Sequence, residues 1–236
     1  MAARTGSNPP PTDPKHAVRA TRSAGRKTRS LLLDAASRLF RERGLSGASI
    51  SDIAALADAF PSQITYYFRT KEALFVEAAC RDMLYVARAA EQAALLANTP
   101  RRYTQALVET VTATDAVAFF AEALTLTRRR PDLAPLVERT IERLHSEGLR
   151  AYSGQIAHHG WRTLRDPDAT SRRFWAVAIG VMVEGYAMGR SADELCAEML
   201  RVLGDQATTT SEGARLRLVG ERGASLSTSS DGEASS

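Results

Sequence analysis

Apolar residues recur at helical spacing along most of the chain. A clear example lies near the N-terminus, where successive apolar positions are three and four residues apart: Leu32, Ala35, Ala36, Leu39 and Phe40. Such spacing places all of them on one continuous helix face. Similar patterns continue to about residue 204, and no run shows the strict alternation and flanking turn residues of a strand. The sequence therefore predicts an all-α protein.

Breaks in the apolar pattern divide it into helices. Gly44 ends the first, because glycine is favoured just beyond a helix C-terminus. Ser49 with Asp52 three residues later is typical of a capped helix start, and Pro61 suits the first turn of a third helix. The predicted helices span residues 28–43, 50–57, 61–68, 70–96, 101–113, 115–129, 132–158, 170–189 and 191–204.

The two ends of the chain have few large apolar residues. Prolines 9–11 in residues 1–25, and the abundance of Ser, Thr and Gly in residues 205–236, predict a disordered arm and a disordered tail. The first 30 residues contain seven Lys or Arg and one Asp, whereas the net charge of the whole chain is +4. A basic arm beside a neutral body indicates a polyanionic partner, although a solvated tail has a similar composition.

Three short helices with a tight turn before the third have the outline of a helix-turn-helix DNA-binding module. On the third helix, the positions away from the apolar face are Ser62, Gln63, Thr65 and Tyr66. Hydrogen-bonding and aromatic side chains suit base edges and thymine methyl groups. The solvent face of any short helix is also polar, so the outline alone leaves both interpretations open.

Three segments, residues 32–44, 48–54 and 64–75, resemble the N-terminal module of TetR-family transcriptional regulators in content, order and spacing. The rest of the chain is similar to the family only in length and helical pattern. The resemblance implies a helix-turn-helix DNA-binding domain at residues 26–72. It implies an effector-binding and dimerisation domain, a helical bundle, at residues 73–204. The expected protein is a cytoplasmic, homodimeric regulator, a repressor released from DNA by a small molecule.

The same resemblance implies roles for individual residues. Ser49, Tyr67 and Lys71 match positions that contact DNA phosphates, and Ser62, Gln63, Thr65 and Tyr66 occupy the exposed positions of the recognition helix. Because of the basic arm, we also expect Arg26, Lys27 and Arg29 to reach phosphates or an adjacent minor groove.

Three positions depart from the family pattern. Thr65 stands where a tyrosine is usual, Asp58 replaces a turn glycine, and Phe60 replaces a Ser or Thr helix cap. Aspartate tolerates the left-handed backbone better than most residues, so the turn is expected to survive. These departures affect the detailed contacts rather than the module.

Two helices near the C-terminus are rich in apolar residues on more than one side. In TetR-like proteins the last two long helices form the dimer interface, although ordinary core helices have the same composition. The residues expected at the interface are Phe174, Val177, Val181, Gly185, Leu195, Met199 and Val202. A twofold dimer predicts a palindromic operator in double-stranded DNA.

Aromatic and flexible side chains on the middle helices are candidates for an effector pocket. They are Tyr85, Phe119, Phe120, Trp161, Trp175, Met182 and Tyr186. Plain core packing is the alternative for each. The sequence does not indicate which small molecule binds.

Several function classes find no support. No hydrolase, metalloprotease, P-loop or dinucleotide-binding motif occurs, so we expect no catalytic residues, no cofactor and no enzyme activity. The histidines lack ligand spacing, which argues against a metal site, and the apolar run at 176–183 is too short to cross a membrane. Cys80 and Cys196 are expected to be free thiols. A helical adaptor that binds proteins and has lost DNA reading remains the alternative function.

Overall fold

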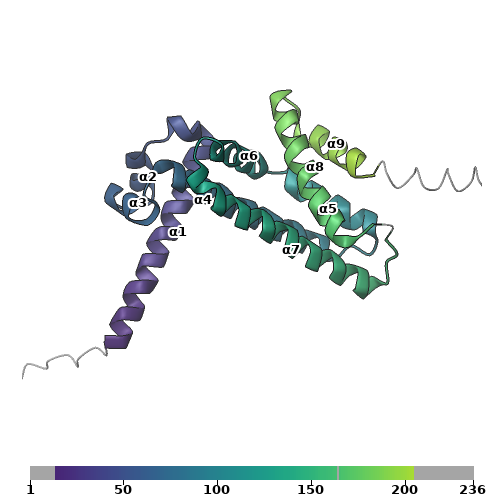
Figure 1. Cartoon of the computed structure of the whole chain (residues 1–236), viewed down its shortest axis with the longest axis horizontal. Coiled ribbons are helices and arrows are strands. Elements are labelled where there is room, and N and C mark those ends of the chain that lie inside the picture. Colours follow the sequence, from purple (N-terminus) through teal and green to yellow (C-terminus); the bar gives the residue numbers. More distant parts are fainter. Residues whose placement is uncertain (1–13, 164, 205–236) are drawn as a thin grey trace, which may run out of the picture. The chain divides into compact units, whose positions relative to one another are not determined.

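The structure, a computed structural model, describes residues 14–163 and 165–204 and is built from helices (Figure 1). No strand occurs among these residues, which confirms the predicted all-α fold, and no helix there is long and apolar enough to cross a membrane. The elements are α1 Pro14–Gly47, α2 Ile50–Leu56, α3 Pro61–Phe68, α4 Lys71–Ala94, α5 Pro100–Thr112, α6 Ala116–Thr127, the 3₁₀ turn η1 Pro131–Leu133, α7 Ala134–His159, α8 Pro167–Ala187 and α9 Ala192–Gly204.

Helix α1 begins earlier than the sequence predicted. The backbone is already helical at Pro14, so the expectation of disorder is wrong for residues 14–25. This segment has little apolar surface, but it is rich in Ala, Arg and Lys, which are good helix formers. Extending an existing helix also avoids the unfavourable nucleation step. The remainder of the expected arm and tail, residues 1–13 and 205–236, lies outside the described residues.

The described residues form two compact units. One comprises those within Met1–Tyr85 and Phe119–Glu142, and the other those within Val86–Ala118 and Arg143–Ser236. The division falls inside α4, α6 and α7, so these helices contribute residues to both units. These units do not correspond to the expected DNA-binding and effector domains, and the boundary between those domains at residue 72 stays a prediction.

An aromatic stack forms the centre of the first unit. The rings of Phe40, Phe75 and Phe119 are at most 3% exposed, and successive ring centroids lie 5.1 and 4.9 Å apart in edge-to-face geometry. Each such pair contributes about 0.5–1.5 kcal/mol beyond the burial of its surface. The stack therefore joins α1, α4 and α6, while α2 packs against both α1 and α3.

Polar contacts also fasten α1 to α4 in this unit. Ser37 donates a hydrogen bond to the Asp82 carboxylate, which is only 8% exposed. Arg81 pairs with Asp34 at 2.9 Å and lies 3.5 Å from Asp82. A buried carboxylate needs such partners, because it loses its hydration on folding.

In the second unit, α9 packs against α5 and α8. Gly185 of α8 is buried where the two helices approach, and a Cβ atom there would collide with the Leu195 side chain. Arg173 donates hydrogen bonds to the carbonyl oxygens of Val202 and Leu203 at the end of α9, at 2.5 and 3.4 Å. These contacts tie the last helix to α8 within a single chain.

Candidate nucleic-acid interface

The turn between α2 and α3 sets the direction of the short helix α3. Asp58 has a φ of 49°, so aspartate adopts the left-handed backbone that the sequence analysis expected of it. Ile64 and Phe68 are 0% and 3% exposed and fix the inner side of α3. The opposite side leaves Ser62, Thr65 and Tyr66 exposed, as predicted for a recognition helix.

Two residues expected at DNA phosphates lie side by side at the start of α2. The Ser49 hydroxyl accepts a hydrogen bond from the Asp52 N–H at 3.0 Å, and the Asp52 carboxylate accepts from the Ser49 N–H at 3.4 Å. Hydrogen bonding to the Ser49 side chain and backbone lowers the pKa of Asp52. Lys71 Nζ donates to the carbonyl oxygen of Ala48, one residue before Ser49, at 3.2 Å. The Lys71 ammonium group is thus held at the backbone beside Ser49, at the start of α2.

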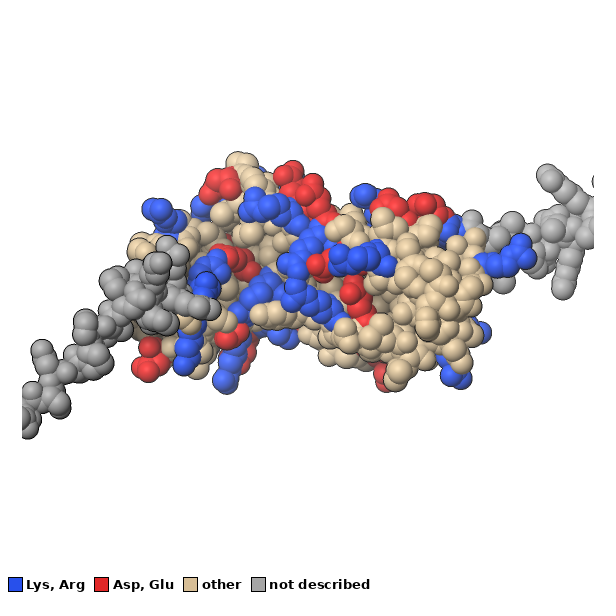
Figure 2. Space-filling model, turned by 90° about the horizontal axis from the view of Figure 1, so that it is seen from below, with Lys and Arg blue, Asp and Glu red and all other residues tan. Residues whose placement is uncertain are grey.

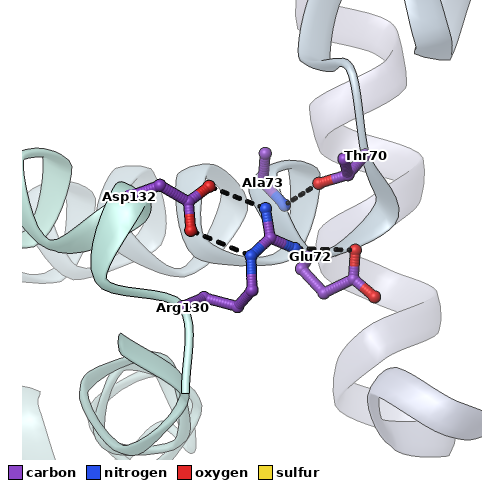
Figure 3. A network of polar contacts seen from close by, with 5 residues as sticks. All are labelled: Thr70, Glu72, Ala73, Arg130 and Asp132. Carbon is purple, nitrogen blue, oxygen red and sulfur yellow. Dashed lines mark hydrogen bonds and ion pairs between the residues drawn. The ribbon is translucent and has the colours of Figure 1, made fainter. Parts of the chain in front are cut away.

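The start of α4, which carries Lys71, is held by a further set of contacts (Figure 3). Thr70 Oγ1 accepts a hydrogen bond from the backbone N–H three residues later, at 3.1 Å. Arg130 lies between two carboxylates: it binds Asp132 through two hydrogen bonds of 2.9 and 2.7 Å and contacts Glu72 at 3.4 Å. The guanidinium group therefore links the first turn of α4 to η1, and the backbone at Lys71 is fixed from both sides.

Tyr66 and Tyr67 differ in environment although they are neighbours. Tyr66 is 77% exposed, and its ring packs edge-to-face on that of Tyr67 with centroids 5.0 Å apart. The Tyr67 hydroxyl reaches α1, where a Cβ atom on Gly25 would lie 3.3 Å from it. Glycine at this position lets α1 pass close to the tyrosine that is expected to contact phosphate.

The three basic residues predicted at DNA do not share one environment. Arg26 and Lys27 are exposed. Arg29 instead pairs with Glu77 of α4, and its guanidinium lies 5.0 Å from the centre of the Phe68 ring. Burial and the nearby Arg81 lower the pKa of Arg29. Arg29 thus differs from Arg26 and Lys27 because its charge is paired within the protein, and its place among the DNA contacts stays a prediction.

Acidic residues accompany the basic ones elsewhere as well. Figure 2 shows Lys and Arg side chains interspersed with Asp and Glu on the face in view. Basic residue types alone therefore do not define a DNA surface on this protein, and the ion pairs decide which cations remain available.

The start of α3 contains an interaction that the sequence analysis missed. Phe60, the residue before the helix, is 75% exposed, and its side chain has no group that accepts a hydrogen bond. The Oε1 atom of Gln63 accepts from the Phe60 N–H at 3.0 Å. This is one half of a capping box, and glutamine at the third helical position was its signal in the sequence.

The expected dimer residues are mostly packed inside the second unit. Phe174, Val181, Gly185, Leu195 and Met199 are buried within one chain, and Val177 and Val202 are half-buried. These five residues are covered by their own chain, and their assignment to a dimer interface stays a prediction. They hold α8 and α9 within the chain, as the alternative of ordinary core helices requires.

The effector candidates are divided between the two units. Phe119 and Phe120 are buried in the first unit, where Tyr85 is 52% exposed with the Arg81 guanidinium 5.4 Å from its ring centre. The second unit contains buried Trp175 and Met182, half-buried Trp161 and the 44% exposed Tyr186. Their role in effector binding stays a prediction.

The second unit also contains a polar and aromatic cluster that the site predictions left out, apart from Trp161. The rings of Tyr103 and Tyr152 are 5.6 Å apart, and Trp161 lies 5.9 Å from Tyr103. Burial, followed by repulsion from Glu147, raises the pKa of Glu91 beside this cluster. Among the described residues, no group of three or more His, Cys, Asp or Glu side chains is arranged to hold a metal ion.

A short helix with an exposed hydrogen-bonding face, mounted by a tight turn on two others, defines a helix-turn-helix DNA-binding protein. Residues 32–78 match the bacterial regulatory proteins of the tetR family, and residues 100–204 match the C-terminal region of bacterial transcriptional repressors. The chain belongs to the TetR family of transcriptional regulators, which confirms the resemblance seen in the sequence. It is therefore a DNA-binding regulator.

Solved structures agree with this assignment. A protein of Rhodococcus sp. RHA1 described as a transcriptional regulator is 35% identical, with 76% of this chain and 94% of that chain covered and a TM-score of 0.68. A TetR-family regulator from Mesorhizobium loti is 21% identical, with 75% and 95% covered and a TM-score of 0.59. The regulator FadR from Bacillus subtilis, in complex with stearoyl-CoA, is 15% identical, with 74% and 96% covered and a TM-score of 0.56. The last two show the fold alone, and no curated protein sequence matches the chain.

Proposed function

We propose that this protein is a homodimeric repressor that binds a palindromic operator and is released by a small-molecule effector, without enzyme activity. The observation that carries the proposal is the exposed face of α3, together with Lys71 held at the start of α2 next to Ser49. Repression requires only that the protein occupies a promoter, whereas activation requires a contact with the polymerase. A repressor is therefore the simpler function for this architecture.

In this proposal, base contacts and phosphate contacts come from different residues. Ser62, Gln63, Thr65 and Tyr66 of α3 contact base edges and thymine methyl groups in the major groove. Phosphates are bound by the three family positions and by the two exposed cations of α1: Ser49, Tyr67, Lys71, Arg26 and Lys27. One short helix contacts few base pairs, so two copies on a twofold site supply the remaining specificity.

We place the dimer contact on the exposed side of α8. Four small or apolar residues there are exposed and recur at intervals of three and four: Ala176, Gly180, Val183 and Ala187. They form one stripe along the helix, opposite the residues that pack against the rest of the unit. Small side chains let the backbone of a partner helix approach closely, so this stripe suits the same helix of a second copy.

The effector is proposed to bind in the helical part that follows the DNA-binding module. FadR with stearoyl-CoA is a precedent for a small molecule bound to this fold. A ligand that binds one spacing of the two recognition helices more tightly shifts the population toward that spacing and so changes operator affinity. The predicted pocket residues include half-buried Trp161, whose fluorescence offers a direct signal of binding.

Selection from a random double-stranded DNA pool at near-physiological salt tests the proposal. A palindrome with half-sites about one helical turn apart is the expected result. The variant S62A/T65A changes two exposed positions of α3 and should retain its circular dichroism but lose the motif. Enrichment without a motif that disappears as salt rises would leave only non-specific binding, and would favour the protein-binding adaptor instead.

A further inference from the structure

We infer that Gln63 recognises a guanine in each operator half-site and acts there only as a hydrogen-bond donor. The inference rests on the proposed function and specifies the base that one recognition residue selects. It follows from a hydrogen bond inside the protein that uses one end of the Gln63 amide.

The amide oxygen is committed to the start of α3. Oε1 of Gln63 accepts from the Phe60 N–H at 3.0 Å. Phe60 stands at the helix cap and has no side-chain acceptor, and Pro61 follows it in the first turn. The Gln63 side chain is therefore the group that completes this helix end, which gives its amide plane a fixed orientation.

The other end of the amide is available. Nε2 carries two N–H groups, and none of the described residues accepts a hydrogen bond from it. Gln63 is half-buried and lies between the exposed residues Ser62 and Thr65 along the chain. The recognition helix thus presents an NH₂ group, whereas the amide oxygen faces its own backbone.

The chemistry of the major groove then selects the base. Adenine offers one acceptor and one donor, and its usual glutamine contact uses both ends of the amide. Guanine offers two acceptors, N7 and O6, which match two N–H donors. Thymine offers one acceptor, and cytosine offers a donor that would oppose Nε2. Guanine is therefore the best partner for an amide whose oxygen is already bound.

Two substitutions separate base recognition from helix capping. Q63M removes both base recognition and helix capping. The operator position at which Q63M loses its base preference is therefore the position that Gln63 contacts. In Q63E one carboxylate oxygen still accepts from the Phe60 N–H, and a negative charge in the first helical turn is favourable. The second oxygen then accepts from the N4 amino group of cytosine. The melting temperature of Q63E should equal or exceed that of the wild type.

The experiment applies selection from the random double-stranded DNA pool to the wild-type chain, Q63M and Q63E. We expect the wild type to select guanine at the position identified with Q63M, and Q63E to select cytosine on the same strand. The relative preference for guanine should fall by about 5- to 100-fold in Q63M, the range for loss of one good base contact. Overall affinity of Q63E should also fall, since its charge repels phosphates.

Each other outcome overturns the inference. Adenine at this position in the wild type would show that the amide leaves the helix cap and uses both ends on the base. A wild-type palindrome whose preferences are the same in both variants would show that Gln63 only caps α3. A wild type that selects no motif would refute the proposed operator binding itself, and the inference with it.

Discussion

Gly148 lies where α7 and α8 approach within the second unit. A Cβ atom there would be 2.5 Å from Ser171 Oγ and 3.5 Å from Ser171 Cβ. Ser171 is only 7% exposed, and its hydroxyl donates to the carbonyl oxygen of His145 at 3.1 Å. The substitution Gly148→Ala should therefore displace the hydroxyl and break this buried hydrogen bond.

The expected magnitude is a balance of two effects. Overpacking of a core site costs about 1–3 kcal/mol, and replacing glycine by alanine inside a helix returns about 1 kcal/mol. We expect Gly148→Ala to lower the free energy of unfolding by up to about 2 kcal/mol. Gly154 in the same helix is the matched control, because its Cβ position has no heavy atom within 4 Å apart from its chain neighbours and the backbone of its own helix. Gly154→Ala should raise stability by about 0.5–1 kcal/mol.

A second substitution tests whether the Ser171 hydroxyl is the cause. Ser171→Ala removes Oγ and leaves a Cβ distance of 3.5 Å, an ordinary van der Waals contact. Alone it should cost about 0.5–1.5 kcal/mol for the lost hydrogen bond. In this background, Gly148→Ala should become stabilising, with a coupling energy of about 2 kcal/mol between the two sites.

Urea unfolding followed by tryptophan fluorescence measures these differences. Trp161 and Trp175, the two tryptophans of the chain, both belong to the second unit and report its unfolding. Protein concentration must be held constant, since the proposed dimerisation would contribute to apparent stability. Equal effects of Gly148→Ala and Gly154→Ala would refute the close contact. Failure of Ser171→Ala to reverse the sign would refute the role of the hydroxyl.

Three further predictions concern the proposed DNA contact, the proposed dimer and a half-buried carboxyl group. Lys71→Ala should weaken DNA binding for all sequences alike and reduce the salt slope by about 1 in anisotropy titrations; an unchanged slope would limit Lys71 to its bond with Ala48. Val183→Asp should convert the dimer to a monomer in sedimentation velocity, and a persisting dimer would exclude the α8 stripe. Burial and repulsion from Glu147 raise the pKa of Glu91 in the folded state. The charged carboxylate therefore lowers the stability of the fold above this raised pKa. The lost stability is regained as the pH falls through the raised pKa. Glu91→Gln should therefore raise the melting temperature at pH 7, with a gain that disappears below the ordinary pKa of 4.5; a gain independent of pH would contradict this.

The DNA-binding module was the most predictable part of the molecule, because its signals are local. The Ser49–Asp52 capping pair, Pro61 in the first turn of α3 and Asp58 in the turn all occupy the structural positions that the sequence indicated. Gly44 has a φ of 68°, as expected of a glycine that interrupts a helix. Each signal acts over three or four residues, so no knowledge of tertiary packing was needed.

The beginning of α1 and the inner side of α8 were not predictable in the same way. Residues 14–25 contain few large apolar residues, which argues against a buried helix but not against a helix that continues from an established one. Helix α8 is apolar on two sides, and apolar content alone does not say which side packs inside the chain. Leu195 and Met199 of α9 are buried against the rest of the unit. The side of α8 that faces α9 is therefore the side that packs inside the chain.

The set of DNA contacts illustrates the limit of sequence reasoning most directly. Arg26 and Arg29 are equally basic and lie three residues apart. Of these two, only Arg29 pairs with Glu77, which lies 48 residues further along the chain. The sequence likewise does not show that the Gln63 amide oxygen accepts a hydrogen bond from the Phe60 N–H. Composition and spacing identify the groups capable of binding DNA, whereas specificity depends on which donors and acceptors the fold has left uncommitted. The Arg29–Glu77 pair is a tertiary contact that emerges only when the helices are in place, whereas the Gln63–Phe60 hydrogen bond is local and had a signal in the sequence.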